Sequence, residues 1–422
     1  MKDKWRIRYR ESVELMGRSR INILTGFNAN IDLLYSLEDL KLNLNDVDAE
    51  IVNPVENLSD LKSNLKYCAE NGQNQEVNGE GFHEVMGDGA DKRIGGQAGI
   101  IANYLSGFDN YVAFHTPLLS DDLAEMMNSN VVSPVVDGKL LLKRVQECTN
   151  TDRTKKNTII EFNGEKTGRL IVSDKLRGFG PYFRKGVEEN FEVLEDEMDR
   201  MIFSGYQNIE GNFETKINKA KKQLNNINTD KHLEYVSMTG EKSQELLEEI
   251  VEEFESIGMD ESEAKQIAEL LDVETSKDKL SSIEGLKLAK ELIEEKDLSR
   301  VHIHTYRYHL CVTSEDYKIS AEKIRKSLLF GEASAIQMAD QGSIPNKNDM
   351  EEFNLEKKHI HRVEPLEELG HEFSKEEFAA EGIYEDEEFT IVAVPSLIHE
   401  DPERLVGMGD IISSGAFTAE LK

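Results

Sequence analysis

Hydrophobic and polar positions follow a strand and helix rhythm along most of the chain. Short apolar runs predict buried strands at 21–27, 201–206, 232–236, 301–306 and 389–395. Amphipathic stretches predict helices at 212–225, 241–255 and 281–296, since their apolar residues recur with the period of a helix face. Alternation of this kind predicts a mainly parallel sheet with helices on both faces. Ligands of such folds bind beyond the carboxyl ends of the strands.

Polar residues gather at those predicted strand ends. Because the carboxyl ends of parallel strands meet at one edge of a sheet, we expect a single crevice to collect them. The residues that follow, or nearly follow, a strand end are Asn30, Asp32, Tyr206, Glu234, Tyr306 and Asp410.

The region from 135 to 177 has a different character. Apolar runs at 140–142, 158–162 and 168–172 predict further strands. Basic residues concentrate here, and a local positive field could guide an anionic substrate, although solvated strand faces explain it equally well. These residues are Lys139, Lys143, Arg144, Arg153, Lys155, Lys156, Arg169, Lys175 and Arg177.

Size and composition narrow the class of protein. A chain of 422 residues exceeds the usual size of one hydrophobic core, so two domains, or one with an insertion, are expected. A net charge of −32 argues against nucleic acids and anionic membranes as partners and favours a protein that stays soluble in salt. The chain shows no membrane span or signal-peptide core, and its three cysteines are widely spaced. A cytoplasmic protein without disulfides or a zinc site is expected.

The segment Val406–Asp410 carries the strongest chemical signal. It follows the strand predicted at 389–395 and precedes a small-residue helix at 411–417. Its two glycines let backbone N–H groups approach an anion, and the helix N-terminus adds its positive dipole end. Asp410 would repel phosphate there unless it takes a proton from an alcohol as a phosphoryl group arrives. The pattern indicates a kinase acting on a hydroxyl; the alternative is a tight turn with an N-capping Asp.

Two blocks near the N-terminus could hold a sugar. Asn28, Asn30 and Asp32 alternate with apolar residues and would share one face of an extended chain, offering donors and acceptors to hydroxyls. Turn formation is the alternative for these residues. Gly95 and Gly96 precede a small-residue helix and could admit polar groups of a ligand, although packing explains them nearly as well.

A third block, Asp260–Glu263, opens an acidic helix. Its carboxylates could hold the waters around Mg²⁺. Ordinary acidic residues of a first helical turn are the alternative.

In this order, the motifs resemble those of the ADP-dependent sugar kinases, the archaeal-type glucokinases and phosphofructokinases of the ribokinase-like superfamily. The resemblance covers nearly the whole chain. It rests on the motifs at 26–32, 93–100, 203–207, 232–235, 256–263, 301–305 and 406–410.

The resemblance implies an α/β fold, a ribokinase-like doubly wound sheet with a smaller α/β lid domain. Residues 1–32, 93–134 and 183–422 would form the large nucleotide-binding domain. Residues 33–92 and 135–182 would form the lid, which closes over the sugar.

The resemblance also implies roles for individual residues. Asp410 would be the catalytic base, and the amides of Gly407, Met408 and Gly409 would bind the transferred phosphoryl group. Asn30, Asp32, Gly96 and Gln97 would hold sugar hydroxyls. Glu234, Asp260 and Glu263 would organise Mg²⁺ and its waters. Two positions depart from the family pattern, since Asp260 stands where Asn is usual and Ile411 where Thr is frequent.

The implied donor is ADP, which becomes AMP in a modified glycolysis. The acceptor is glucose, fructose 6-phosphate or both, because a lid Glu favours glucose while lid cations favour a sugar phosphate. Glu76 matches that Glu, with Glu70 and Glu84 as competing positions. The phosphate-binding cations would be Lys156, Arg169 and Arg177. Both features together predict a bifunctional enzyme.

Three rival functions stay open at this point. One is a kinase specific for a single sugar, and another is an ATP-dependent carbohydrate or nucleoside kinase. The third is a catalytically silent sugar- or nucleotide-binding protein, against which the intact Asp410 counts. We expect a monomer or a small homo-oligomer.

Overall fold

The computed structural model describes the chain except residues 18, 87–89, 164–165, 176–177, 239 and 400–401. Its main feature is an 11-stranded sheet with the order β16-β17-β14-β13-β12-β11-β10-β1-β5-β6-β7. The strands from β6 through β1 to β13 run parallel, whereas β7, β14, β17 and β16 pair antiparallel to their neighbours. The bounds are β1 Asn22–Gly26, β5 Tyr111–His115, β6 Val132–Asp137, β7 Lys139–Arg144, β10 Arg200–Phe203, β11 Lys231–Glu234, β12 Ser256–Asp260, β13 Arg300–His304, β14 Tyr308–Ser314, β16 Ile383–Glu385 and β17 Phe389–Pro395.

Helices cover both faces of this sheet because the chain reverses its direction of winding at β1. The strand after β1 in this sheet, β5, lies on one side, and the series β10 to β13 proceeds on the other. Right-handed crossovers then place the connecting helices on opposite faces. One layer contains α1, α13, α17 and α5, each in contact with the next, and the other contains α9 to α12 and α15.

The helices of the large lobe have the following bounds: α1 Lys2–Val13, α5 Gln97–Ser106, α6 Asp121–Glu125, α7 Lys185–Glu188, α8 Phe191–Glu195, α9 Phe213–Leu224, α10 Glu241–Glu249, α11 Glu261–Leu270, α12 Ser282–Lys296, α13 Ala321–Gln341, α14 Lys347–Glu351, α15 Glu364–Glu372, α16 Phe378–Glu381 and α17 Met408–Ala419. A two-stranded sheet, β15 His359–Ile360 with β18 Leu397–Ile398, completes this lobe.

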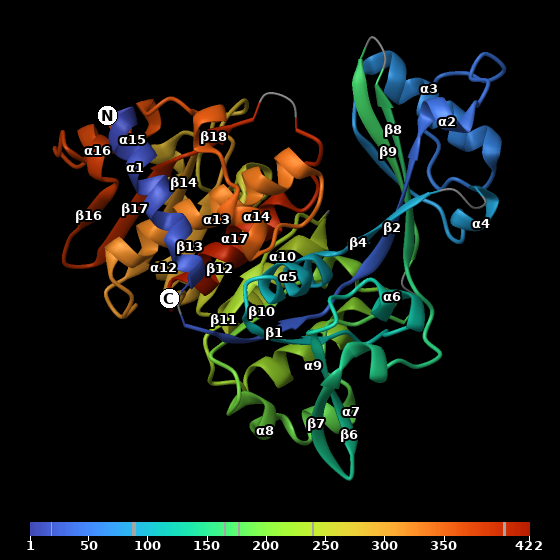
Figure 1. The fold of residues 1–422 in the computed structure, drawn as a ribbon, viewed down its shortest axis with the longest axis horizontal. Helices are drawn as coiled ribbons and strands as arrows, with labels where there is room; N and C mark the ends of the chain where they lie inside the picture. Colours follow the sequence, from blue (N-terminus) through green and yellow to red (C-terminus); the bar gives the residue numbers. More distant parts are fainter. Residues whose placement is uncertain (18, 87–89, 164–165, 176–177, 239, 400–401) are drawn as a thin grey trace.

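A second, five-stranded sheet with the order β3-β9-β8-β2-β4 forms the lid. Its strands are β2 Asn30–Ser36, β3 Gln75–Asn78, β4 Asp91–Gly95, β8 Lys156–Asn163 and β9 Thr167–Ser173. The helices α2 Leu37–Leu40, α3 Leu58–Asn71 and α4 His83–Met86 belong to it. Figure 1 shows the lid as a separate lobe that β2 and β4 connect to the larger one.

The α/β class and the two-sheet architecture agree with the sequence-based prediction, but the strand pairing differs from the predicted boundaries. Residues 135–144, expected in the lid, form most of the β6–β7 hairpin at the edge of the large sheet. Strand β4 lies wholly in the lid sheet, although the boundary was expected at residue 93. The hairpin turns at Gly138, which has φ +69°, so its two strands pair locally and then join β5. Apolar periodicity predicts a strand but not its partner.

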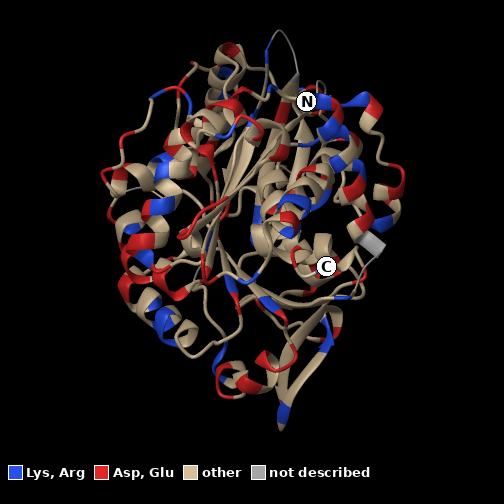
Figure 2. Cartoon of the chain, turned by 90° about the vertical axis from the view of Figure 1, so that its left-hand side faces the viewer, with Lys and Arg blue, Asp and Glu red and all other residues tan. Residues whose placement is uncertain are grey.

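Other local differences are small. The helix expected at 241–255 ends at Glu249, and a buried strand, β12, follows where no strand was expected. The long buried helix α13 and strand β14 were not identified from the sequence. The chain has 82 Asp and Glu residues against 50 Lys and Arg residues, and Figure 2 shows positions of both kinds distributed over the outer helices. Among the described residues, no helix is both long and apolar enough to cross a membrane.

Candidate active site

A cavity of about 690 Å³ lies between the lid sheet and the carboxyl ends of the large sheet's strands. It brings together residues from β2, β3, β8, β9, β11, β12, β13 and the starts of α5 and α17, which are far apart in sequence. Most of the predicted site residues line it: Asn30, Asp32, Glu76, Gly96, Gln97, Arg169, Glu234, Asp260, Glu263, Gly407, Gly409 and Asp410.

Three polar side chains of this cavity are held in one hydrogen-bonded group. Asp32 Oδ1 accepts from Asn30 Nδ2 at 2.6 Å and from Asn157 Nδ2 at 3.1 Å. Burial raises the pKa of Asp32, and these two hydrogen bonds oppose the rise. A Cβ atom on Gly95 would lie 2.4 Å from both Asn30 Nδ2 and Asp32 Oδ2. Any side chain at this position would therefore displace the Asn30 and Asp32 side chains. The arrangement presents fixed donors and acceptors to hydroxyl groups.

The turn before α17 has the geometry of an anion site. Gly407 adopts φ +88° and forms the N-cap, and the 12-residue helix α17 begins at Met408. The first turn of a helix leaves backbone N–H groups without helical partners, and Gly407 and Gly409 line the cavity, whereas the Met408 N–H donates to Leu405 O at 3.3 Å. Asp410 lies in this first turn. Withdrawal from bulk water raises the pKa of Asp410 to about 7, and the Arg404 guanidinium opposes that rise. A carboxyl poised near neutral pH suits a general base.

Further carboxylates face Asp410 across the cavity. Glu234 is buried, and both its burial and the charge of Asp410 raise its pKa. Burial and then Asp260 raise the pKa of Glu263 to about 8. Nε2 of the buried His232 lies 3.4 Å from Glu234 Oε2 and 2.9 Å from Ser413 Oγ. These contacts help to fix the orientation of the Glu234 carboxylate.

Asp260 also has a structural task. Its Oδ1 accepts from the N–H groups of Ser262 at 2.8 Å and Glu263 at 2.9 Å, and Glu263 Oε2 accepts from the Asp260 N–H at 2.8 Å. This is a capping box at the start of α11. Among the described residues, no group of three or more His, Cys, Asp or Glu side chains is arranged to hold a metal ion directly.

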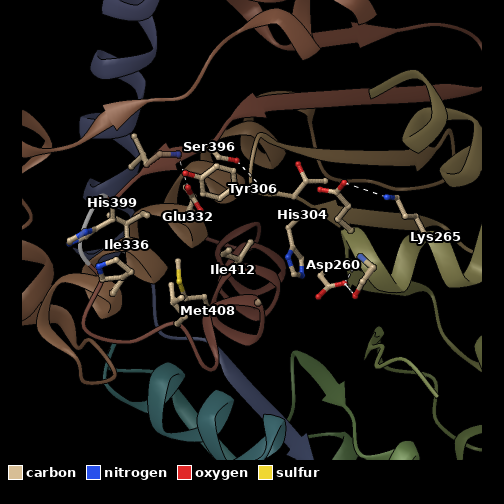
Figure 3. Close-up of a pocket in the computed structure, with 18 of the residues that line it drawn as sticks. Asp260, Lys265, His304, Tyr306, Glu332, Ile336, Ser396, His399, Met408 and Ile412 are labelled. Atoms are coloured by element: carbon tan, nitrogen blue, oxygen red, sulfur yellow. Dashed lines mark hydrogen bonds and ion pairs between the residues drawn. The ribbon is translucent and has the colours of Figure 1, made fainter. Parts of the chain in front are cut away.

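A second cavity, of about 590 Å³, adjoins the first. The two share Asp260, His304, Leu405 and Gly409 in their walls. Apolar side chains from α13, β18 and α17 form much of its surface, and Glu332, Ser396 and His399 add polar groups (Figure 3). A largely apolar cavity that adjoins a glycine turn at a helix N-terminus suits a nucleotide, whose base would occupy the cavity and whose phosphates would lie at Gly409.

Comparison with known proteins decides the family. A family model described as the ADP-specific phosphofructokinase/glucokinase conserved region matches residues 21–419. The chain belongs to this family. The predicted family and kinase class are therefore confirmed.

The relatives include both named activities. The chain is 28% identical to the ADP-specific phosphofructokinase of Pyrococcus horikoshii, with 95% of this chain and 98% of the relative covered. It is 26% identical to the ADP-dependent glucose/glucosamine kinase of Pyrococcus furiosus, with coverage of 99% and 98%. A solved ADP-dependent kinase in complex with fructose 6-phosphate and ADPβS superposes with a TM-score of 0.84 at 27% identity, covering 99% of this chain and 98% of that one.

One predicted cation of this kinase was wrong. Lys156 Nζ pairs with Asp122 Oδ2 at 2.6 Å, and Lys156 does not line the first cavity. Its neighbour Lys155 does, and donates to Asn208 Oδ1 at 3.1 Å. Successive side chains of an extended segment point to opposite sides, so an error of one residue places the charge on the wrong face. Arg177 lies outside the described residues.

The two tyrosines expected in the crevice are placed differently. Tyr206 is buried in the core, only 2% exposed, and does not line the first cavity. Tyr306 lines the second cavity and is 68% exposed. Proximity to a strand end predicted the right edge of the sheet but not the direction of each side chain.

Sequence reasoning missed Arg404. It is buried, and its Nε donates to Val406 O at 3.0 Å. Its positive charge opposes the rise that burial causes in the pKa values of both Asp32 and Asp410. The signal was a lone arginine just before the glycine turn. Asn157, which lines the first cavity, carried no signal that separates it from ordinary surface amides, whereas Gln207, which also lines it, belongs to the motif at 203–207 but received no role.

Proposed function

We propose that this kinase transfers the β-phosphoryl group of ADP to the C1 hydroxyl of fructose 6-phosphate, the C6 hydroxyl of glucose, or both. The observation that carries the proposal is the junction of the two cavities at Gly409, with Asp410 on the side of the sugar-facing residues. A donor in the apolar cavity and an acceptor in the polar one meet at this turn. The names of the relatives support the same two acceptors and the ADP donor.

In this reaction Asp410 takes the proton of the acceptor hydroxyl. The hydroxyl oxygen forms a bond to the β-phosphorus of ADP, the bond from that phosphorus to the bridging oxygen breaks, and AMP leaves with the electron pair. The N–H groups of the Gly407–Gly409 turn stabilise the charge on the transferred group. Asn30, Asp32, Gly96 and Gln97 orient the hydroxyl toward Asp410.

The residues present suit Mg²⁺ as a partner of the phosphates. Glu234, Glu263, Asp260 and Asp410 line one cavity, where burial and then the mutual repulsion of carboxylates raise the pKa values of Glu234 and Glu263. Because no three carboxylates among the described residues converge on one point, Glu234 and Glu263 would hold the ion through its waters, as Mg²⁺ commonly allows. When bound, Mg²⁺ neutralises negative charge on the phosphoryl oxygens. Asp260 contributes charge while its Oδ1 caps α11.

Dual acceptor use is supported by two kinds of lid residue in the same cavity. Glu76 of β3 and Arg169 of β9 both line it, and Lys155 precedes β8 at its floor. A carboxylate can accept from glucose hydroxyls, whereas Lys155 and Arg169 can pair with the phosphate of a sugar phosphate. Arg169 therefore keeps its predicted role, and Lys155 replaces Lys156. Strict preference for ADP, a cytoplasmic location and a monomer or small homo-oligomer stay predictions.

A competition assay tests the shared acceptor site. Glucose phosphorylation is measured with ADP and Mg²⁺ while the concentration of fructose 6-phosphate is raised. One shared site predicts competitive inhibition and formation of both products. Turnover of a single sugar would retain the kinase and remove dual specificity. An absence of turnover with either sugar would favour the silent-binding alternative.

A further inference from the structure

Among the described residues, the apolar cavity beside Gly409 has one acidic side chain at its buried end. Glu332 lies on α13 and is 3% exposed. Ile336 and Ala339 follow it at helical spacing, so the three side chains share the face of α13 that lines the cavity. Met408 and Ile412 lie one turn apart on α17 and line it as well. In Figure 3, Ile412 lies between Glu332 on one side and His304 with Asp260 on the other.

The Glu332 carboxylate is held in a fixed orientation. Its Oε1 accepts from the Leu397 N–H at 2.7 Å, and its Oε2 lies 3.2 Å from His309 Nε2. A carboxylate offers about four lone-pair positions and no donor. Two contacts leave acceptor capacity, and Glu332 lines the cavity wall where that capacity can be used.

Neighbouring polar groups at this end are committed to the protein. Ser396 Oγ donates to Thr305 O at 3.1 Å, and Thr305 Oγ1 donates to Tyr308 O at 2.9 Å. His399 Nε2 pairs with Asp340 Oδ1 at 2.8 Å. Of the side chains that the structure describes at this end, Glu332 is therefore the one that presents a negative, acceptor-only surface to a ligand.

Resting on the proposed function, in which this cavity takes the donor nucleotide, we infer that Glu332 selects the base by accepting from its exocyclic amine. A 6-aminopurine presents N–H donors at that edge. A 6-oxopurine presents a carbonyl oxygen there, which would face the carboxylate with no hydrogen between them. A buried acceptor facing an acceptor leaves both unpaired, and sites built around one hydrogen bond reject such analogues strongly.

The alternative role for Glu332 is purely structural, as an anchor for the Leu397 N–H and His309. Comparing the binding of different nucleotides distinguishes the two roles. A structural anchor affects all nucleotides alike, whereas a base-selecting carboxylate affects the ratio between 6-amino and 6-oxo bases. Glu332→Gln tests this because it keeps the shape and the acceptor for Leu397 N–H while its amide adds a donor.

The experiment measures binding of AMP and IMP by calorimetry and turnover of ADP and IDP with the preferred sugar. The wild type is expected to favour AMP over IMP by about 100-fold or more. In Glu332→Gln that ratio should fall below about tenfold, through weaker AMP binding and stronger IMP binding. The matched control Ile336→Val, one turn along the same face, should weaken both nucleotides by the same factor.

Several results would overturn the inference. They are equal AMP and IMP binding by the wild type, or equal losses for both ligands in Glu332→Gln. If that variant does not fold, the wild type is titrated with purine riboside 5′-monophosphate, which lacks the 6-amino group. Binding as tight as that of AMP would equally contradict the role. Equal turnover of ADP and IDP by the wild type would contradict base selection by Glu332 but leave the proposed kinase activity intact. A preference for AMP over IMP without any sugar phosphorylation would contradict the proposed kinase activity but leave the role of Glu332 intact.

Discussion

Replacement of Asp410 by Asn should remove activity and stabilise the fold at the same time. The carboxyl has a pKa of about 7 in the folded chain against an ordinary value of 3.8. The unfolded chain therefore releases this proton at a lower pH than the folded chain does. The resulting destabilisation is absent below about pH 4, grows as the pH rises, and is complete above about pH 7. Asn carries no charge and escapes this cost.

The magnitude follows from the shift. About three pKa units at about 1.4 kcal/mol each give about 4 kcal/mol above pH 7. At about pH 5.5 only about half of the interval is crossed, which leaves about 2 kcal/mol. The stabilisation of Asp410→Asn over the wild type should thus increase by about 2 kcal/mol between pH 5.5 and pH 8.5. Turnover should fall by about 10²- to 10⁴-fold, the usual contribution of a general base.

The assay is urea unfolding in EDTA at both pH values, followed through Trp5. This is the chain's single tryptophan and is fully buried on α1. Asp340→Asn is the control of opposite sign, because hydrogen bonding to Lys358 lowers the pKa of Asp340, so its loss should destabilise the fold near neutral pH. Equal stability of Asp410→Asn and wild type at both pH values, or a gain that does not change with pH, would refute the reasoning.

Three further predictions concern turnover. Lys155→Met should raise the KM for fructose 6-phosphate by about tenfold or more while Lys156→Met leaves it near wild type, since hydrogen bonds to charged groups contribute about 1.5–3 kcal/mol; equal effects would remove the assignment of Lys155. Glu76→Ala should reduce glucose turnover more than fructose 6-phosphate turnover in steady-state assays, and unchanged glucose kinetics would exclude the role of Glu76. With a net charge of −32, activity and solubility should rise between low and molar KCl, and indifference to salt would contradict this expectation.

The sequence predicted well that the candidate site residues gather at one edge of the sheet, for a physical reason. Asn30, Glu234 and Asp410 each follow or lie near strand ends, and parallel strands bring these ends together whatever the intervening loops do. The glycine turn was equally informative. Gly407 adopts φ +88°, a conformation that favours glycine. A carboxylate beside a proposed anion site repels the anion, so Asp410 at this place indicated a base that accepts a proton during the reaction.

What the sequence could not predict depends on side-chain direction and on distant partners. Lys155 and Lys156 differ by one position but face different surroundings. Arg404 lies in a loop without a motif, and Glu332 lines the second cavity from a helix that sequence analysis did not identify. The hairpin β6–β7 has strand periodicity, yet only the folded structure shows that it extends the large sheet.

The central claim is that this chain transfers a phosphoryl group from ADP to a sugar. The most direct measurement incubates the purified chain and Mg²⁺ with ADP or ATP, against glucose or fructose 6-phosphate, and quantifies AMP and sugar phosphate together. The account predicts equal amounts of AMP and sugar phosphate with ADP, and turnover of both sugars. Activity with ATP alone, or no AMP formation under any of the four conditions, would contradict it.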